Sequence, residues 1–440
     1  MSLGKAPGLD EITLEHVRYA HPLLLVVLSR LFNLFVFAGV VPDSFCVSYT
    51  VPLLKGTASV NSKSLCVDDF RGISISPVIS KIFEHCILDK FGSFLVSSDN
   101  QFGFKKQSGC NNAIYTLRSV VDYFVSRNTT VNICSLDLSK AFDKMNHDAL
   151  FIKLMDRNVP LKLLCLIEFW FSHTQTCVQW DSFRSSFFTL QCGVRQGGVL
   201  SPYLFALYID TVISHVISHN VGCCVKQTNF SIMVYADDIL LLSPSVCVLQ
   251  DLLTICENQL IDIDMHINSS KSFCLRIGPD FKLNPSHLIT HNGAAISWSP
   301  RIRYLGIYIV SKSVFHCSLD HSKRSFYMSF NSIYGKIGNV ASEELLIHLV
   351  KTKCLPKMLY GLECLTLNKA QLASLDFVVN SAMIKIFKTK SSDVILECKK
   401  TFGLQKIENY ILQRRATFLN KMKARALVSN NIVNNILAIL

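Results

Sequence analysis

The fold is decided by the stretch Met233-Val234-Tyr235-Ala236-Asp237-Asp238-Ile239-Leu240-Leu241-Leu242, in which two adjacent carboxylates stand between two apolar runs. Two such runs around a short polar pair are typical of two strands joined by a tight turn. Acids at the tip of a buried hairpin repel each other and lose hydration, so the arrangement needs cations. For this stretch alone, an ordinary solvated Asp-Asp turn is the alternative.

A second acid lies at the end of an apolar run, in Asn132-Ile133-Cys134-Ser135-Leu136-Asp137-Leu138-Ser139-Lys140-Ala141-Phe142-Asp143. Residues 131–137 read as a buried strand, and we expect a helix after Ser139. A strand end fixes the position of a catalytic acid, although a plain acid near a helix N-terminus is the alternative. Acids at two strand ends indicate a site for magnesium, which prefers carboxylate oxygens.

A third stretch, Gln191-Cys192-Gly193-Val194-Arg195-Gln196-Gly197-Gly198-Val199-Leu200-Ser201-Pro202, lies between the other two. Its glycines allow close approach of the backbone to a ligand, and a helix begins at Ser201-Pro202. The spacing fits neither a Walker loop nor a dinucleotide fingerprint.

In this order, the three stretches resemble motifs A, B and C of the palm of reverse transcriptases, with Tyr235-Ala236-Asp237-Asp238 as the signature tetrapeptide. The closest group is the reverse transcriptase domain of non-LTR (LINE-type) retrotransposons. Further stretches that resemble motifs of that group are residues 5–10, 51–55, 69–74, 101–104, 108–110, 267–272, 304–306 and 355–361.

The resemblance implies a role for each matching residue. The catalytic residues would be Asp137, Asp237, Asp238 and Lys271, and the three acids would hold two Mg²⁺ ions, with Mn²⁺ as a substitute. The nucleotide-binding residues would be Lys55, Arg71, Phe142, Gln196 and Gly197. The primer grip would be Tyr304, Leu305 and Gly306. By pattern alone, the cations are solvated side chains, Phe142 is a core residue, and Tyr304 ends a strand at a glycine turn.

The chain of 440 residues is too long for one core. Its alternating strands and helices predict an α+β protein, and the resemblance implies a right-hand polymerase fold with fingers, an antiparallel-sheet palm and a helical thumb. We expect fingers at 1–130, with 145–190 returning to the fingers and palm. The palm is expected at 131–310 and a basic helical thumb at 311–440.

The positive charge is concentrated in the last third of the chain. Residues 1–300 carry 23 Lys and Arg against 24 Asp and Glu, whereas residues 301–440 carry 21 against 8, a net of +13. Such a basic region favours binding to a polyanion, although a solubilising charged face is the alternative. The resemblance implies an RNA template, a DNA primer and dNTPs as partners.

The 17 cysteines are scattered and no C-x-x-C occurs, which indicates free thiols in a reducing intracellular compartment. The resemblance also implies that the protein is located in the nucleus. The best membrane-spanning candidate, residues 23–41, contains Arg30 and Asn33. We therefore expect a buried core helix there and no membrane partner.

The predicted function is RNA-directed DNA polymerisation, with two-metal transfer of a nucleotide onto a primer 3′-hydroxyl. One alternative is a catalytically decayed, truncated retroelement remnant that only binds nucleic acid, for which the loop at Gly56 would be one place of drift. Others are a group II intron maturase-like enzyme and an RNA-dependent RNA polymerase. The endonuclease domain usual in LINE-type elements is expected to be absent from this chain.

Overall fold

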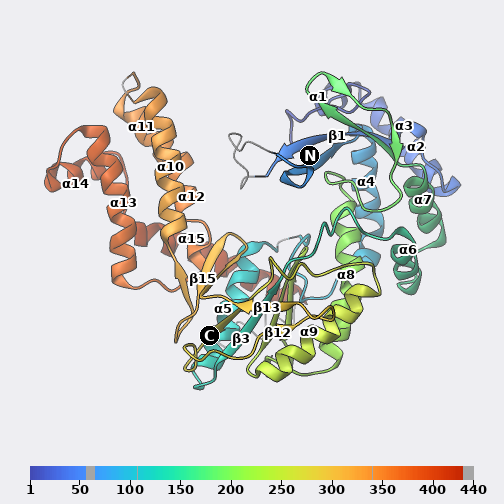
Figure 1. Ribbon diagram of the computed structural model, residues 1–440. Coiled ribbons are helices and arrows are strands. Elements are labelled where there is room, and N and C mark those ends of the chain that lie inside the picture. The colour runs from blue at the N-terminus through green and yellow to red at the C-terminus, as the bar shows by residue number, and fades with distance from the viewer. Residues whose placement is uncertain (56–64, 107, 339, 430–440) are drawn as a thin grey trace. The chain divides into compact units, whose positions relative to one another are not determined.

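The computed structural model describes residues 1–55, 65–106, 108–338 and 340–429, so the loop at Gly56 lies outside the described residues (Figure 1). The chain forms two compact units. Unit 1 comprises Met1–Phe104, Leu138–His215 and Ile255–Asn268, and unit 2 comprises Lys105–Asp137, Val216–Thr254 and Ser269–Leu440. Both units combine helices with strands, which confirms the predicted α+β class. The predicted boundaries of fingers, palm and thumb stay a prediction.

Unit 1 is built around one small sheet with helices packed on it. Its elements are α1 (Leu14–Tyr19), α2 (Leu23–Ala38), α3 (Asp43–Cys46), β1 (Val47–Leu54), η1 (Val67–Asp69), β2 (Phe70–Ile75), α4 (Val78–Phe91), η2 (Gly92–Leu95), α6 (His147–Asp156), α7 (Leu161–Ser172), β4 (Gln175–Trp180), β5 (Phe183–Arg184) and β6 (Phe188–Thr189). Two further helices, α8 (Ser201–Ser218) and α9 (Val246–Ile261), run through both units. The strand order is β2-β1-β4-β5, and β6 also pairs with β4.

Aromatic side chains form the centre of unit 1. Phe83 of α4 is 1% exposed and stacks on Trp170 of α7, with ring centroids 5.8 Å apart. Phe32 of α2 and Phe45 of α3 contact the same Phe83 ring. Aromatic pairs in tilted and stacked geometries contribute beyond the area they bury, so this cluster holds α2, α3, α4 and α7 together.

The prediction that residues 23–41 form a buried helix is wrong in part. Helix α2 forms, and Gly39 ends it in the left-handed conformation. Only its Leu28 and Phe32 are buried, whereas Phe37 is 71% exposed. A helix that packs on one face buries only residues three or four positions apart. When all faces of the helix are apolar, the sequence does not show which face is buried.

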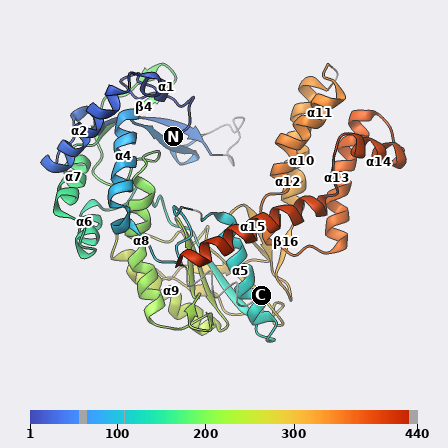
Figure 2. The ribbon, with the colours of Figure 1, turned by 180° about the vertical axis from the view of Figure 1, so that it is seen from behind.

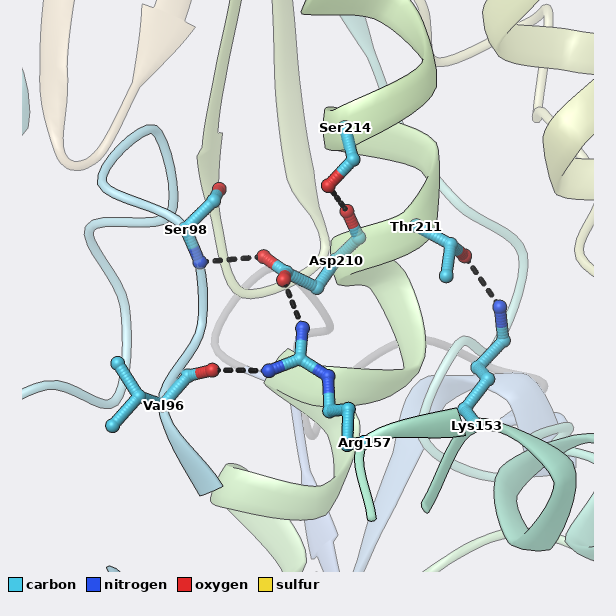
Figure 3. A network of polar contacts seen from close by, with 7 residues as sticks. All are labelled: Val96, Ser98, Lys153, Arg157, Asp210, Thr211 and Ser214. Atoms are coloured by element: carbon cyan, nitrogen blue, oxygen red, sulfur yellow. Dashed lines mark hydrogen bonds and ion pairs between the residues drawn. The ribbon is translucent and has the colours of Figure 1, made fainter. Parts of the chain in front are cut away.

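A polar network joins three segments of unit 1 (Figure 3). The Asp210 carboxylate of α8 accepts hydrogen bonds from the backbone N–H of Ser98, at 2.6 Å, and from the guanidinium of Arg157. Arg157 also donates to the carbonyl of Val96. Asp210 is only 4% exposed, and a buried carboxylate with a cationic partner and an amide donor is fully satisfied.

Unit 2 contains a six-stranded sheet, two smaller sheets and a helical C-terminal part. Its elements are α5 (Cys110–Val125), β3 (Val131–Leu136), β7 (Cys224–Val225), β8 (Thr228–Asn229), β9 (Ile232–Tyr235), β10 (Asp238–Ser243), β11 (Phe273–Ile277), β12 (Leu288–Ile289), β13 (Ala295–Trp298), β14 (Arg301–Tyr304), β15 (Ile307–Val310), β16 (His316–Ser318), α10 (Asp320–Ile337), α11 (Glu343–Leu349), the π-helical turn η3 (Val350–Cys354), α12 (Leu355–Met358), η4 (Leu362–Cys364), α13 (Lys369–Phe387), α14 (Ser392–Thr401) and α15 (Ile407–Ser429).

The six-stranded sheet has the order β12-β13-β11-β3-β10-β9, with β3 between two antiparallel neighbours. Five of the six residues of β3 are buried, as expected for a strand covered on both faces. Helices α5 and α15 lie over one face of the sheet (Figure 2), and Tyr115 of α5 contacts Phe418 of α15 with ring centroids 5.4 Å apart. The end of β3 and the start of β10 lie side by side in this sheet.

Among the described residues, one helix, α13, is long and apolar enough to cross a membrane, judged by length and composition alone. Its buried side includes Leu375, Val379 and Met383. It contacts α10, α11, α14 and α15. The apolar residues of α13 therefore take part in helix packing within unit 2.

Candidate active site

The predicted hairpin at residues 231–242 is confirmed: β9 and β10 pair antiparallel, with Tyr235 opposite Asp238. Ala236 and Asp237 form the two-residue turn, and Ala236 adopts the left-handed conformation with φ 59°. Asp238 is the first residue of β10. Such a turn keeps both carboxylates at the tip of the hairpin.

The register of the central strands brings Asp137 to the same edge. Ile239 of β10 pairs with Leu136 of β3, so Asp137 follows β3 directly beside the start of β10. The backbone N–H of Asp137 donates to the hydroxyl of Ser272, at 3.1 Å, and Ser272 is fully buried. Ser272 therefore fixes the backbone of the first acid, a role that the resemblance of residues 267–272 to a family motif does not assign to this serine.

The three acids influence one another electrostatically. The pKa of Asp238 is raised to about 6, first by partial burial and then by the charges of Asp237 and Asp137, while Arg303 opposes the shift. Such a shift means that the ionised carboxylates repel each other. A divalent cation would relieve this repulsion, and a set of carboxylate oxygens suits Mg²⁺. Within the described residues, no group of three or more His, Cys, Asp or Glu side chains is arranged so that it could hold a metal ion.

Lys271 lies at the same edge of the sheet. Lys271 lies in the turn that precedes β11, next to Ser272, whose hydroxyl accepts a hydrogen bond from the backbone N–H of Asp137. The Lys271 side chain is exposed. The edge thus combines acids with one cation that is open to solvent.

The predicted primer grip forms a second hairpin turn in unit 2. Tyr304 of β14 pairs with Ile307 of β15, and Leu305 and Gly306 between them have φ 44° and 86°. Tyr360 supports this turn, because its hydroxyl donates to the carbonyl of Leu305 at 3.0 Å. The Tyr304 side chain is 2% exposed, and its hydroxyl has no hydrogen-bond partner in the described part of the chain.

The predicted nucleotide-binding residues all belong to unit 1, where contacts join some of the segments that carry them. The N–H of Ser74 in β2 donates to the carbonyl of Gln196 at 2.7 Å, which joins the glycine-rich turn to the strand that carries Arg71. The Gln196 side chain donates to Asp143 at 2.8 Å. Lys55 follows β1, the neighbour of β2, and its ammonium donates to the carbonyl of Asp68 at 2.6 Å.

Gly197 is confined by the contact between the glycine-rich turn and Ser74 of β2. Its φ is +126°, and a Cβ atom there would lie 2.5 Å from the carbonyl oxygen of Ser74. Only glycine meets both conditions. The glycine-rich turn is therefore fitted closely against β2.

Phe142 is half-buried and stacks on Phe205 of α8, with ring centroids 4.2 Å apart, and Phe104 contacts its edge. The helix expected after Ser139 is wrong for these residues: 139–144 form turns, and α6 begins only at His147, capped by Asn146. The turn geometry is held by the N–H of Val194, which donates to the carbonyl of Phe142. This tertiary contact overrides the local helical pattern.

Residues 60–309 match the family model described as reverse transcriptase (RNA-dependent DNA polymerase). The match covers more than half of the chain, and the chain therefore belongs to this family. The predicted right-hand polymerase class and the resemblance to non-LTR elements are confirmed. Members of the family use divalent metal ions, whereas the role of each site residue stays a prediction.

The chain is similar to the RNA-directed DNA polymerase from the mobile element jockey of Drosophila funebris, with 25% identity over 82% of this chain and 39% of that protein. It is 26% identical to the Pol polyprotein from the retrotransposable element R2DM of Drosophila melanogaster, over 63% of this chain and 25% of that protein. It therefore spans less than half the length of these relatives. Among solved structures, apo telomerase from Candida tropicalis has a TM-score of 0.46 at 12% identity, over 91% of this chain and 67% of that chain.

Proposed function

We propose that this chain is the polymerase part of a non-LTR retrotransposon protein, an RNA-directed DNA polymerase that extends a DNA primer on an RNA template. The observation that carries the proposal is the arrangement of Asp237 and Asp238 at the β9–β10 turn, directly beside Asp137 at the end of β3. Family membership over residues 60–309 supports the same function.

Asp137, Asp237 and Asp238 are the residues that would hold two Mg²⁺ ions, and Mn²⁺ would serve in their place. The ions supply activation of the primer 3′-hydroxyl and charge neutralisation at the departing pyrophosphate. The chain's own residues position the reactants. Lys271, at the edge where Asp137 lies, has an exposed ammonium that would give a proton or a positive charge to the pyrophosphate.

The residues gathered in unit 1 would bind the incoming dNTP. Lys55 and Arg71 would hold the triphosphate, since ammonium and guanidinium groups are the usual partners of phosphate oxygens. Phe142, stacked on Phe205, would pack against the sugar and exclude a 2′-hydroxyl. Gln196 and Gly197 would shape the remaining wall of the pocket.

The primer and template would be held by unit 2. Tyr304, Leu305 and Gly306 would support the primer end. The net charge of +13 over residues 301–440 would bind the phosphate backbone of the template–primer duplex. We further propose that the protein acts in the nucleus, where a retrotransposon's DNA target lies.

A primer-extension assay tests this function, with poly(rA)–oligo(dT), dTTP and Mg²⁺. The wild type should extend the primer, and the double variant Asp237→Asn/Asp238→Asn should not. Asp251→Asn is the matched control, because Asp251 is an exposed acid of α9 in unit 2, outside the site. A wild type that binds the duplex in a salt-sensitive way but never extends it would instead support a remnant that only binds nucleic acid.

A further inference from the structure

Glu84 is a buried acid that the predicted site does not include. It lies on α4 and is 4% exposed. One of its carboxylate oxygens accepts hydrogen bonds from the backbone N–H groups of Val199 at 2.5 Å and Leu200 at 2.7 Å. Both amides lie just before the first residue of α8, Ser201. The N–H groups at the start of a helix have no partners within it. Glu84 therefore caps α8 from a distant element.

Burial raises the pKa of the Glu84 carboxyl, and cationic groups on two elements oppose this shift. They are Arg195, which is half-buried, and Lys81, one turn earlier on α4. Arg195 also donates to the carbonyl of Phe45 at 3.2 Å. A buried acid with charged and amide partners is held in one geometry, because each partner would be left unsatisfied if it moved.

The contacts of Glu84 enclose the glycine-rich turn. Between Arg195 and Val199 lie only Gln196, Gly197 and Gly198. Glu84 thus bonds the Val199–Leu200 end of this turn and attracts the Arg195 side chain at the other end, while Ser74 bonds the carbonyl of Gln196. A Cβ atom on Gly198 would lie 3.5 Å from the Glu84 carboxylate, so the acid also lies against the turn itself.

Direct binding of substrate by Glu84 does not fit the space around it. The cavity that Glu84 and Arg195 line has a volume of about 40 Å³. About 10–15 Å³ of such space holds one water, and ligand pockets usually measure about 300–1,000 Å³. Glu84 can therefore affect a nucleotide only through the turn.

We propose that Glu84 is a positioning residue for the incoming dNTP, which fixes the Gln196–Gly198 turn through the amides of Val199 and Leu200 and through Arg195. This inference rests on the proposed polymerase function. A displaced turn would weaken nucleotide binding and leave binding of the template–primer duplex unchanged, because the charge proposed to hold the duplex belongs to unit 2.

Steady-state primer extension with full-length variants tests the role of Glu84. Glu84→Ala removes the acceptor and should raise KM for dTTP about 10-fold, with kcat within about 3-fold, since small misplacements of a binding group have large effects. Glu84→Gln keeps an acceptor oxygen and should raise KM about 3-fold. The Kd for poly(rA)–oligo(dT) should not change in either variant.

Asp210→Asn is the matched control, because Asp210 is equally buried in unit 1 and has an Arg partner and an amide donor but no contact with the turn (Figure 3). It should lower the melting temperature and leave KM for dTTP unchanged. If both Glu84 variants shift KM no more than Asp210→Asn, the positioning role is overturned. A wild type without any extension would overturn the proposed function itself. An active wild type whose Glu84 variants keep the same KM would refute only the positioning role of Glu84.

Discussion

At the level of single residues, the carboxylate of Asp238 combines partial burial with two acidic neighbours, which raises its pKa to about 6. In the absence of metal, this repulsion destabilises the folded protein. The raised pKa determines the sign of the pH effect. The contribution of Asp238 to the free energy of unfolding is fully present below its unfolded pKa near 4, and it is lost as the pH rises through about 6.

We therefore predict that Asp238→Asn raises the melting temperature of the protein in EDTA by a few degrees at pH 7, and by less at pH 4.5. The variant should also lose the stabilisation that Mg²⁺ confers on the wild type, since ligand binding to the folded state shifts the melting temperature. Thermal unfolding with and without Mg²⁺ measures both effects. A variant that melts below the wild type in EDTA at pH 7 would contradict the prediction.

Phe142 is the residue predicted to select the sugar. Phe142→Val shortens the side chain that stacks on Phe205, and incorporation of UTP relative to dTTP should rise by about 10-fold or more. Single-nucleotide extension with each substrate measures the ratio of the two kcat/KM values. Phe151→Leu is the control, because Phe151 contacts Phe171 and belongs to a different aromatic pair of unit 1. An unchanged ratio would assign Phe142 to packing alone.

At the level of elements, the glycine-rich turn approaches β2 so closely that the contact leaves no room for a side chain at Gly197. Gly197→Ala would force a Cβ atom to 2.5 Å from the Ser74 carbonyl at a φ that favours glycine. We expect at least about a 100-fold loss in kcat/KM for dTTP. Gly92→Ala is the control, since a Cβ there meets no atom within 4 Å. A fully active Gly197→Ala enzyme would show that the turn does not shape the pocket.

Elements with strong local patterns were predictable from the sequence. The β9–β10 hairpin and the buried strand β3 follow from apolar runs that end at acids, and both form as expected. The helix expected after Ser139 does not form there, because Phe142 is held by a hydrogen bond to Val194, 52 residues away in the chain. The exposure of α2 likewise depends on which neighbours pack against it.

The supporting residues of the site were not predictable in this way. Ser272 bonds the backbone of Asp137, and Glu84 bonds the amides of Val199 and Leu200. Glu84 has no local pattern that distinguishes it from any other helical acid, and the motif-like stretch 267–272 implies no role for its last residue, Ser272. Their roles arise from contacts between elements more than 100 residues apart, which one sequence does not reveal.

At the level of the whole molecule, the concentration of positive charge in residues 301–440 predicts binding that weakens steeply with salt. Lys421 and Lys423 are exposed on α15. Lys421→Gln/Lys423→Gln should reduce the slope of log K against log salt by about 2, because each neutralised phosphate contact contributes about 1. Fluorescence anisotropy with labelled duplex measures the slope, and Lys282→Gln, outside the basic region, is the control. Equal slopes for wild type and double variant would exclude α15 from the binding surface.

The order of strands in the six-stranded sheet has a consequence for synthesis of the chain. Strand β3 (Val131–Leu136) pairs with β10 on one side and β11 on the other, and these strands end only at Ser243 and Ile277. While a ribosome makes the intervening residues, β3 is an apolar segment with unpaired edges, which is a template for aggregation. Pairing over such sequence distances is also slow to nucleate. Nascent chains that stop before Ile277 should therefore depend on chaperones more than the finished protein does.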